Sequence, residues 1–250
     1  MPGSPLLSRL LWSLVLLLGV SLALYGTFAT VHYSWHWSVV WGYRAQFLWG
    51  WVATMVISLG AMVISMLLGF ALMLGRRSPW EPVRLFCSGT VEIVRGSPLL
   101  VQLLIGYYIV ATALHVNSPV LVGTILLGLF EAAYLAEIFR GAVESIGASQ
   151  WEAARAVGFN TQQTYRHVII PQAVRRALPG TTGELVSLIK SSSLLSVIGI
   201  EELVQKVRVM NSASYTALEG YLPLAVAYLI VTLPLSWWAR RLERRFAYET

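Results

Sequence analysis

Residues 150–172, with the sequence QWEAARAVGFNTQQTYRHVIIPQ, form the one long polar, helix-forming segment that lies between apolar stretches. Ser149 and Glu152 have the spacing of a capping box, in which a hydroxyl and a carboxylate bind the free N–H groups that open a helix. Gly158 lacks a Cβ atom and can take the left-handed conformation that ends a helix. The segment therefore predicts two short helices that meet at a bend near Gly158.

The second short helix is predicted to begin at Thr161, whose hydroxyl can cap it. Pro171 has no N–H to donate, so it either ends this helix or starts the next one. In the first helix, the small side chains of Ala153 and Ala154 would let another backbone approach closely, while Glu152 offers a directional contact. Taken alone, the heptad E-A-A-R-A-V-G is also typical of an ordinary Ala-rich amphipathic turn.

The composition of the 250-residue chain places it in the membrane class. It is 56% hydrophobic and 12% charged, with a mean hydropathy of +0.66, which is far outside the range of soluble domains. The apolar stretches predict an all-α polytopic protein with about six membrane helices, at residues 6–29, 51–75, 92–113, 120–139, 179–199 and 221–238. The first stretch also fits a signal peptide, but we expect an uncleaved anchor. Residues 201–220 are expected to form an outer loop.

The net charge of +6 is explained by membrane topology and does not require a nucleic-acid partner. Fourteen of the eighteen Lys and Arg residues fall on one side if the predicted spans alternate, and Arg44, Lys206 and Arg208 fall on the other. An excess of Lys and Arg marks the cytoplasmic side. This asymmetry predicts that both termini and residues 150–172 lie in the cytoplasm. The fourteen are Arg9, Arg76, Arg77, Arg84, Arg95, Arg140, Arg155, Arg166, Arg175, Arg176, Arg240, Arg241, Arg244 and Arg245.

Three motifs resemble those of the membrane subunits of ATP-binding-cassette (ABC) importers. The spacing of Glu-Ala-Ala, Gly and Val-Ile-Ile-Pro in residues 152–171 resembles the EAA loop, which in that family sits in a cleft of the ATPase subunit. R-G-S-P-L-L-V-Q at 95–102 and A-Y-L-A-E-I-F-R-G at 133–141 resemble segments of the polar amino-acid importers. The resemblance implies a coupling role for one set of residues: Glu152, Ala153, Ala154, Gly158 and Pro171.

The same resemblance implies a fold, a function and a set of partners. The fold would be that of a type I ABC importer permease, with an N-terminal anchor and aromatic belt at 1–46 and the permease domain at 47–245. The chain would be a multi-pass inner-membrane subunit importing polar amino acids of the histidine, glutamine, glutamate or arginine type. Its partners would be an ABC ATPase subunit, a periplasmic substrate-binding protein, a second permease copy or a sister permease, and membrane lipid.

The side-chain inventory argues against an enzyme and against a resident cofactor or metal. The two lysines, Lys190 and Lys206, do not follow a glycine, so the chain lacks a phosphate-binding loop of the G-x-x-x-x-G-K type, and it contains no Asp and a single cysteine. ATP hydrolysis is therefore expected from a separate subunit. The alternatives are a secondary transporter or channel, an ABC permease for another solute class, and a membrane enzyme using Glu131 and His115 as acid and base.

Charges inside two predicted spans are candidates for the substrate pathway. Glu131 and Lys190 both fall near the middle of a hydrocarbon core, where an unpaired charge costs about 2.5–3.5 kcal/mol or more, so both should face the protein interior. They could pair with each other, or bind the ammonium and carboxylate groups of an amino acid. Tyr134 and Glu137, in the 133–141 motif, complete the set of pathway candidates.

Overall fold

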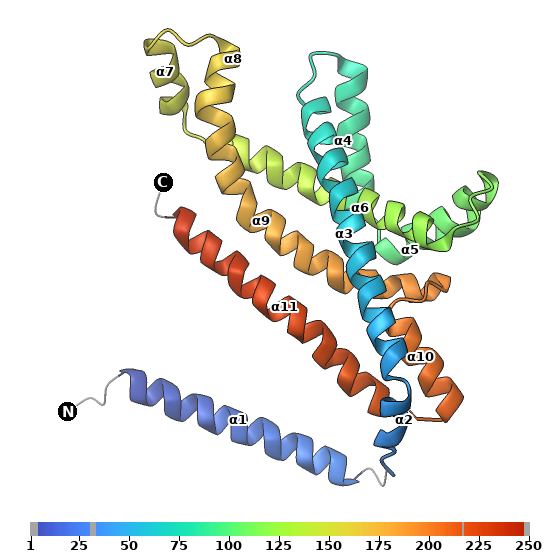
Figure 1. Cartoon of the computed structure of the whole chain (residues 1–250). Helices are drawn as coiled ribbons and strands as arrows, with labels where there is room; N and C mark the ends of the chain where they lie inside the picture. The colour runs from blue at the N-terminus through green and yellow to red at the C-terminus, as the bar shows by residue number, and fades with distance from the viewer. Residues whose placement is uncertain (1–4, 31–33, 217, 248–250) are drawn as a thin grey trace. The chain divides into compact units, whose positions relative to one another are not determined.

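The computed structural model describes residues 5–30, 34–216 and 218–247, and all regular structure in these ranges is helical (Figure 1). The α-helices and the short π- and 3-10-helical turns (η) follow one another along the chain as α1 (Pro5–Thr30), α2 (Trp37–Gly42), α3 (Arg44–Gly75), α4 (Glu81–Gly96), α5 (Leu99–Ile105), η1 (Gly106–Ala111), α6 (Pro119–Glu144), α7 (Ala148–Ala156), α8 (Thr161–Thr164), η2 (Tyr165–Ile169), α9 (Ile170–Ser191), η3 (Ser192–Ile198), α10 (Leu203–Ser214) and α11 (Leu218–Ala247).

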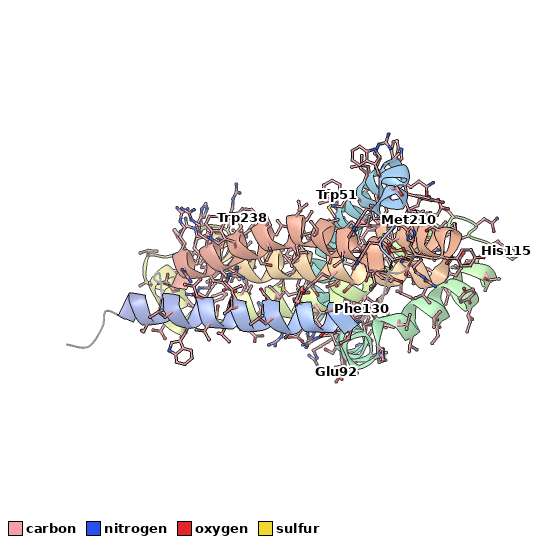
Figure 2. The ribbon with its side chains drawn as sticks, turned by 90° about the horizontal axis from the view of Figure 1, so that it is seen from below. Trp51, Glu92, His115, Phe130, Met210 and Trp238 are labelled. Atoms are coloured by element: carbon pink, nitrogen blue, oxygen red, sulfur yellow. The ribbon has the colours of Figure 1, made fainter. Side chains whose placement is uncertain are left out.

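The chain divides into two compact units, residues 1–37 and 38–250. The first unit holds the apolar helix α1. The second holds the helices from α3 onward and contains every site described below. In Figure 2, His115 and Trp238 lie toward opposite ends of this second unit. The predicted domain boundary at 46/47 stays a prediction.

Helices α3 and α6 form the centre of the second unit and approach each other through glycines. A Cβ atom on Gly69 would lie 2.9 Å from the Ala132 carbonyl oxygen, and one on Gly128 would lie 3.0 Å from the Ala61 carbonyl oxygen. A Cβ atom on Gly60 would lie 3.2 Å from the Thr124 methyl group. Gly60 and Gly69 therefore leave room for the close approach of α6. Because the contacts advance along both helices together, α3 and α6 run in the same direction.

The outer surface of these helices has the character of a membrane protein. Successive turns of α3 expose large apolar side chains, which include Val52, Val56, Leu59, Val63 and Leu67. In water such a surface would be a liability, whereas lipid or another membrane subunit covers it without cost. Helices α3, α6 and α11 are each long and apolar enough to cross a membrane.

Two further pairs of helices, each bent at a short break, are apolar enough to cross the membrane if each pair counts as one span. The described residues therefore contain three spans, or up to five. The first predicted span, at 6–29, coincides with α1, whose described apolar part is Leu11–Thr27. The count of six therefore stays a prediction.

The prediction of one straight span at 92–113 is wrong. The chain forms α4 and then α5 with η1, and the two parts meet at an angle of 110°. The break lies at Ser97 and Pro98, both of which have extended ψ values of 149° and 135°. A proline disfavours helical conformation in the residue before it, which explains the position of the break. Gln102 stabilises the corner by donating from Nε2 to the Val94 carbonyl oxygen at 2.7 Å.

The prediction of an outer loop at 201–220 is also wrong, because α10 occupies most of it. The Glu202 carboxylate, with a fully buried side chain, caps this helix by accepting from the N–H groups of Val204 and Gln205, both at 2.9 Å. The hydroxyl of Thr54 in α3 accepts from the Leu203 N–H at 3.2 Å and lies 3.5 Å from the same carboxylate. This cap draws on a residue 148 positions away, so local periodicity did not reveal it.

Helix α9 also begins earlier than the predicted span at 179–199. It starts at Ile170 and passes through Pro179, which is buried inside the helix. The last span is longer than predicted as well, since α11 covers Leu218–Ala247 and contains Pro223 and Pro234.

Candidate functional site

The polar segment forms α7 and α8, which stand at the ends of α6 and α9 (Figure 1). The prediction of a second short helix is wrong, because α8 continues through η2 into α9 without a break. The predicted caps are wrong in detail. Helix α7 begins at Ala148, after Gly147, and no side chain caps it, so Ser149 and Glu152 lie inside the helix. Asn160 caps α8 instead of Thr161, because its side chain accepts from the Gln163 N–H while the Gln163 side chain accepts from the Asn160 N–H. The capping box therefore occurs at the second helix.

Gly158 makes the bend between the two helices, as predicted. Its φ is +82°, in the left-handed region that favours glycine. The Gly158 N–H donates to the Arg155 carbonyl oxygen at 2.9 Å, and the Phe159 N–H donates to the Ala154 carbonyl oxygen at 3.0 Å. These two bonds are those of a Schellman motif, which satisfies the last carbonyl groups of α7.

The bend is anchored to the transmembrane helices beneath it. Ile146, Ile169 and Ala173 form a buried cluster that joins the end of α6, η2 and the start of α9. Trp151 of α7 packs edge-to-face on Tyr165, with ring centroids 5.2 Å apart.

Polar contacts add to this anchorage. Gln172 donates to the Gln150 side chain at 3.1 Å, and Arg176 donates to the Ser145 hydroxyl at 3.0 Å. Packing and polar contacts thus join α7 to the ends of α6 and α9.

The other face of α7 is free in the isolated chain. Glu152, Ala153 and Gly158 are exposed, whereas Ala154 is buried against the rest of the segment. Pro171 is exposed and lies in the first turn of α9, which continues directly from η2, so the helix neither ends nor starts anew there. The chain thus presents a small-residue face with one carboxylate, suited to close approach by another backbone.

A cluster of charges lies at the same end of the unit and unites two of the sequence motifs. The Glu137 carboxylate accepts from Arg76 at 2.6 Å and from Arg140 at 2.7 Å, and Arg95 lies 3.5 Å away. The Arg95 guanidinium also stacks over the Tyr134 ring, 5.4 Å from its centroid. Glu137 therefore holds α3, α4 and α6 together, and its role in the structure is that of a shared counter-ion.

Glu131 lies where a charge is least expected. Its side chain is 2% exposed in the middle of α6, and its Oε2 has no hydrogen-bond partner in the described part of the chain. The Glu184 side chain in α9 lies close enough to interact with it. Glu184 was missed in the sequence, although an acid inside an apolar span is a recognisable signal.

Lys190 does not join Glu131. Its side chain is exposed, and no ion pair is recorded for it among the residues that the structure describes. It lies six residues beyond Glu184, which is ~9 Å along the helix and on a different face. The two charges thus occupy separate surroundings in a single chain.

Comparison with known proteins now identifies the family. Residues 67–248 match the family described as the binding-protein-dependent transport system inner membrane component. The chain belongs to this family. It is therefore a multi-pass inner-membrane permease subunit, and it works with an ATPase subunit and a substrate-binding protein. The permease itself is not the catalytic subunit of the transporter.

Individual relatives align with most of this chain. The chain is 36% identical over 215 residues to the glutamine transport system permease protein GlnP of Escherichia coli (strain K12), and the alignment covers 84% of this chain and 96% of the relative. It is 33% identical over 206 residues to the arginine ABC transporter permease protein ArtQ of Haemophilus influenzae, covering 76% and 90%.

A solved structure shows that the fold is shared. The crystal structure of an amino acid ABC transporter with histidines superposes on this chain with a TM-score of 0.79. The two are 32% identical, and the match covers 85% of this chain and 100% of the other. The predicted all-α ABC importer permease fold is confirmed, and the alternatives of a secondary transporter and of an enzyme are set aside.

Proposed function

We propose that this permease imports polar amino acids delivered by a periplasmic binding protein. Support comes from the relatives, whose names specify glutamine and arginine, and from the A-Y-L-A-E-I-F-R-G motif at 133–141. The motif's two charged residues, Glu137 and Arg140, are bonded to each other at the end of the unit that carries α7.

The observation that carries the transport mechanism is the anchorage of α7. Glu152, Ala153 and Gly158 form an exposed edge suited to a cleft of the ATPase, and Ala154 packs behind them. When the ATPase subunits move, the segment moves as a body with the ends of α6 and α9, because packed contacts join all three. Pro171 lies in the first turn of α9, so the same displacement enters the helix that leads toward the outer end of the permease.

Four side chains remain candidates for the substrate pathway. Glu131 and Lys190 would act in different places, since the first is buried against Glu184 and the second is exposed. Tyr134 and Glu137 lie with Arg95 at the inner end, where they would control the exit. A second permease, either another copy or a sister chain, would complete the pathway, and lipid or that partner would cover the exposed apolar side of α3.

The proposed function is tested by reconstituting the permease with its ATPase and binding protein in proteoliposomes. We expect one or a few polar amino acids to stimulate ATP hydrolysis and to accumulate in the vesicles. Sugars, phosphonates and metal ions serve as controls from other solute classes. Stimulation by one of these, and by no amino acid, would refute the assignment.

The pathway residues are tested in the same complex by Glu131→Gln and Lys190→Met. Loss of uptake with assembly and basal ATP hydrolysis intact would support a place on the pathway. Unchanged affinity for the transported amino acid would remove the residue from it.

A further inference from the structure

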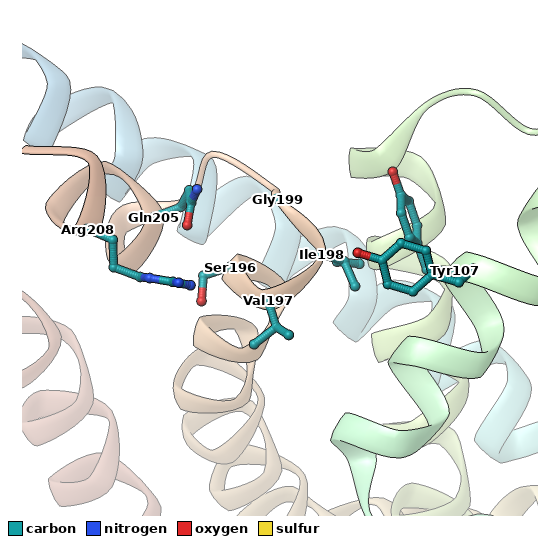
Figure 3. A pocket seen from close by; sticks show the side chains of 8 residues that line it. Tyr107, Ser196, Val197, Ile198, Gly199, Gln205 and Arg208 are labelled. Carbon is teal, nitrogen blue, oxygen red and sulfur yellow. The ribbon is translucent and has the colours of Figure 1, made fainter. Parts of the chain in front are cut away.

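A cavity of about 490 Å³ opens between η1 and the segment that joins α9 to α10 (Figure 3). Tyr107 forms one wall, Ser196 and Val197 of η3 form the floor, and Gln205 and Arg208 of α10 close the other side. The volume falls in the range of small-molecule sites, which is about 300–1,000 Å³. The cavity depends on the break after η3, because a straight helix would carry α10 away from it.

Arg208 is the one charged side chain that lines this cavity. It also lines a neighbouring cavity of about 440 Å³, together with Gln205. Its side chain is exposed, and no ion pair or hydrogen bond is recorded for it in the described part of the chain. By contrast, Lys206, on the same helix, is paired with Glu201 at 2.5 Å. Arg208 therefore offers the cavity a positive charge with free donors.

Gln205 adds an unused acceptor. Its Oε1 atom is buried and has no hydrogen-bond partner among the described residues, although its backbone N–H binds Glu202. A buried acceptor without a partner costs about 1–3 kcal/mol, so such a group calls for a donor. In Figure 3 the side chains of Gln205 and Arg208 extend from α10 toward the same space as Ser196. A positive group and an unpaired acceptor thus converge at one place.

The cavity lies at the end of the unit opposite α7. Gly50, near the start of α3, packs against Leu203 and Lys206 of α10, whereas the arginine-rich end of α3 begins at Arg76. The excess of arginine places that second end in the cytoplasm, so α10 and the cavity lie toward the outer side. Substrate released by a binding protein would reach this cavity before any of the residues at the inner end.

We propose that this cavity is an entry site for the amino acid. Arg208 binds the α-carboxylate, since a guanidinium matches a carboxylate with two parallel N–H donors. The Gln205 side chain, which lines the cavity, rotates to bring its buried Oε1 to the α-ammonium group and accepts from it. The Ser196 hydroxyl, which donates to the Ser193 carbonyl oxygen at 2.8 Å, keeps its own oxygen free to accept as well. The inference rests on the proposed import of amino acids and adds the groups that first receive them.

The test measures binding of radiolabelled L-glutamine and L-arginine to the assembled permease–ATPase complex in lipid nanodiscs, without the binding protein. Arg208→Gln should raise the Kd about 10- to 100-fold, as expected for loss of a charged hydrogen-bonded pair. Arg208→Lys should restore part of the affinity. The α-amides of the same amino acids, which lack the negative charge, should bind the wild type and Arg208→Gln equally.

Gln205→Leu shows whether weaker binding arises from the loss of a binding group or from a loss of stability. It should also weaken binding, yet leave the thermal stability equal to or above that of the wild type, because a buried unpaired oxygen is removed. Arg44→Gln is the matched control. Arg44 lies at the same end and donates to the Trp41 carbonyl oxygen at 2.8 Å, outside the cavity, so its loss should not change the Kd.

The outcomes distinguish this inference from the proposed function. A wild-type complex that transports no amino acid would refute the function itself. A wild type that transports amino acids but does not bind them here, or variants at Arg208 and Gln205 that keep its Kd, would overturn only the entry site. If Arg208→Gln slows uptake without changing the Kd of the free amino acid, Arg208 serves the binding protein and the inference is wrong. If Arg208→Gln does not assemble, the Kd of the Gln205→Leu complex decides: a raised Kd supports the entry site, and an unchanged Kd overturns it.

Discussion

Replacing Gly158 tests whether the bend between α7 and α8 transmits force between subunits. A Cβ atom added there would have open space, with nothing within 4 Å, so crowding contributes nothing to the effect of a substitution. The cost comes from the backbone, whose φ is +82°. Alanine in this region costs about 1–2 kcal/mol. That lowers the population of the bent conformation by a factor of about 5–30.

Different side chains at the same position grade the effect. Asparagine tolerates the left-handed region, so Gly158→Asn should show the smallest loss of uptake. Gly158→Ala should lose more, and Gly158→Val should abolish uptake, because a β-branched residue is an outlier at positive φ. Gly147→Ser is the matched control in the same segment. Gly147 has a φ of −60°, which any residue adopts, and serine is a favoured N-cap, so uptake should stay at the wild-type level.

The assay uses the assembled transporter in proteoliposomes and measures uptake, substrate-stimulated ATP hydrolysis and retention of the ATPase during purification. Capture of substrate by the isolated binding protein should be the same for every variant. The reasoning fails if Gly158→Val retains both uptake and stimulated hydrolysis. It also fails if Gly147→Ser loses as much as Gly158→Ala, since the loss would then not depend on φ.

Three further outcomes follow from the packing and the charges. Glu137→Gln should destabilise the permease by about 1–2 kcal/mol after allowance for solvent, seen as a lower thermal midpoint in detergent. Glu81→Gln, which removes an exposed pair with N and O 3.6 Å apart, should leave that midpoint unchanged, and equal shifts would count against the cluster. Gly69→Ala should cost about 1–3 kcal/mol because its Cβ would meet α6, whereas Gly89→Ala, with open space, should be neutral or stabilising. A reporter fused after Thr250 should read cytoplasmic, and a periplasmic reading would refute the topology.

The sequence by itself determined the class of protein, most of its helices and the bend at Gly158. These follow from short-range rules. Hydropathy over about 20 residues indicates a span. A glycine after a run of helix formers indicates a left-handed end. The gapped motif at 152–171 identified the family because its spacing reflects a surface made by neighbouring residues.

The tertiary structure alone decided which charges meet. Glu131 faces Glu184 and not Lys190, although the sequence places Glu131 and Lys190 at similar depth, because packing against α6 sets the rotation and the level of α9. Glu202 caps α10 in contact with Thr54, 148 positions away, and converts a predicted loop into a helix. The convergence of Gln205 and Arg208 on one cavity depends on that helix and on the break before it. Local patterns do not encode how helices cross, and crossing determines which side chains share a site.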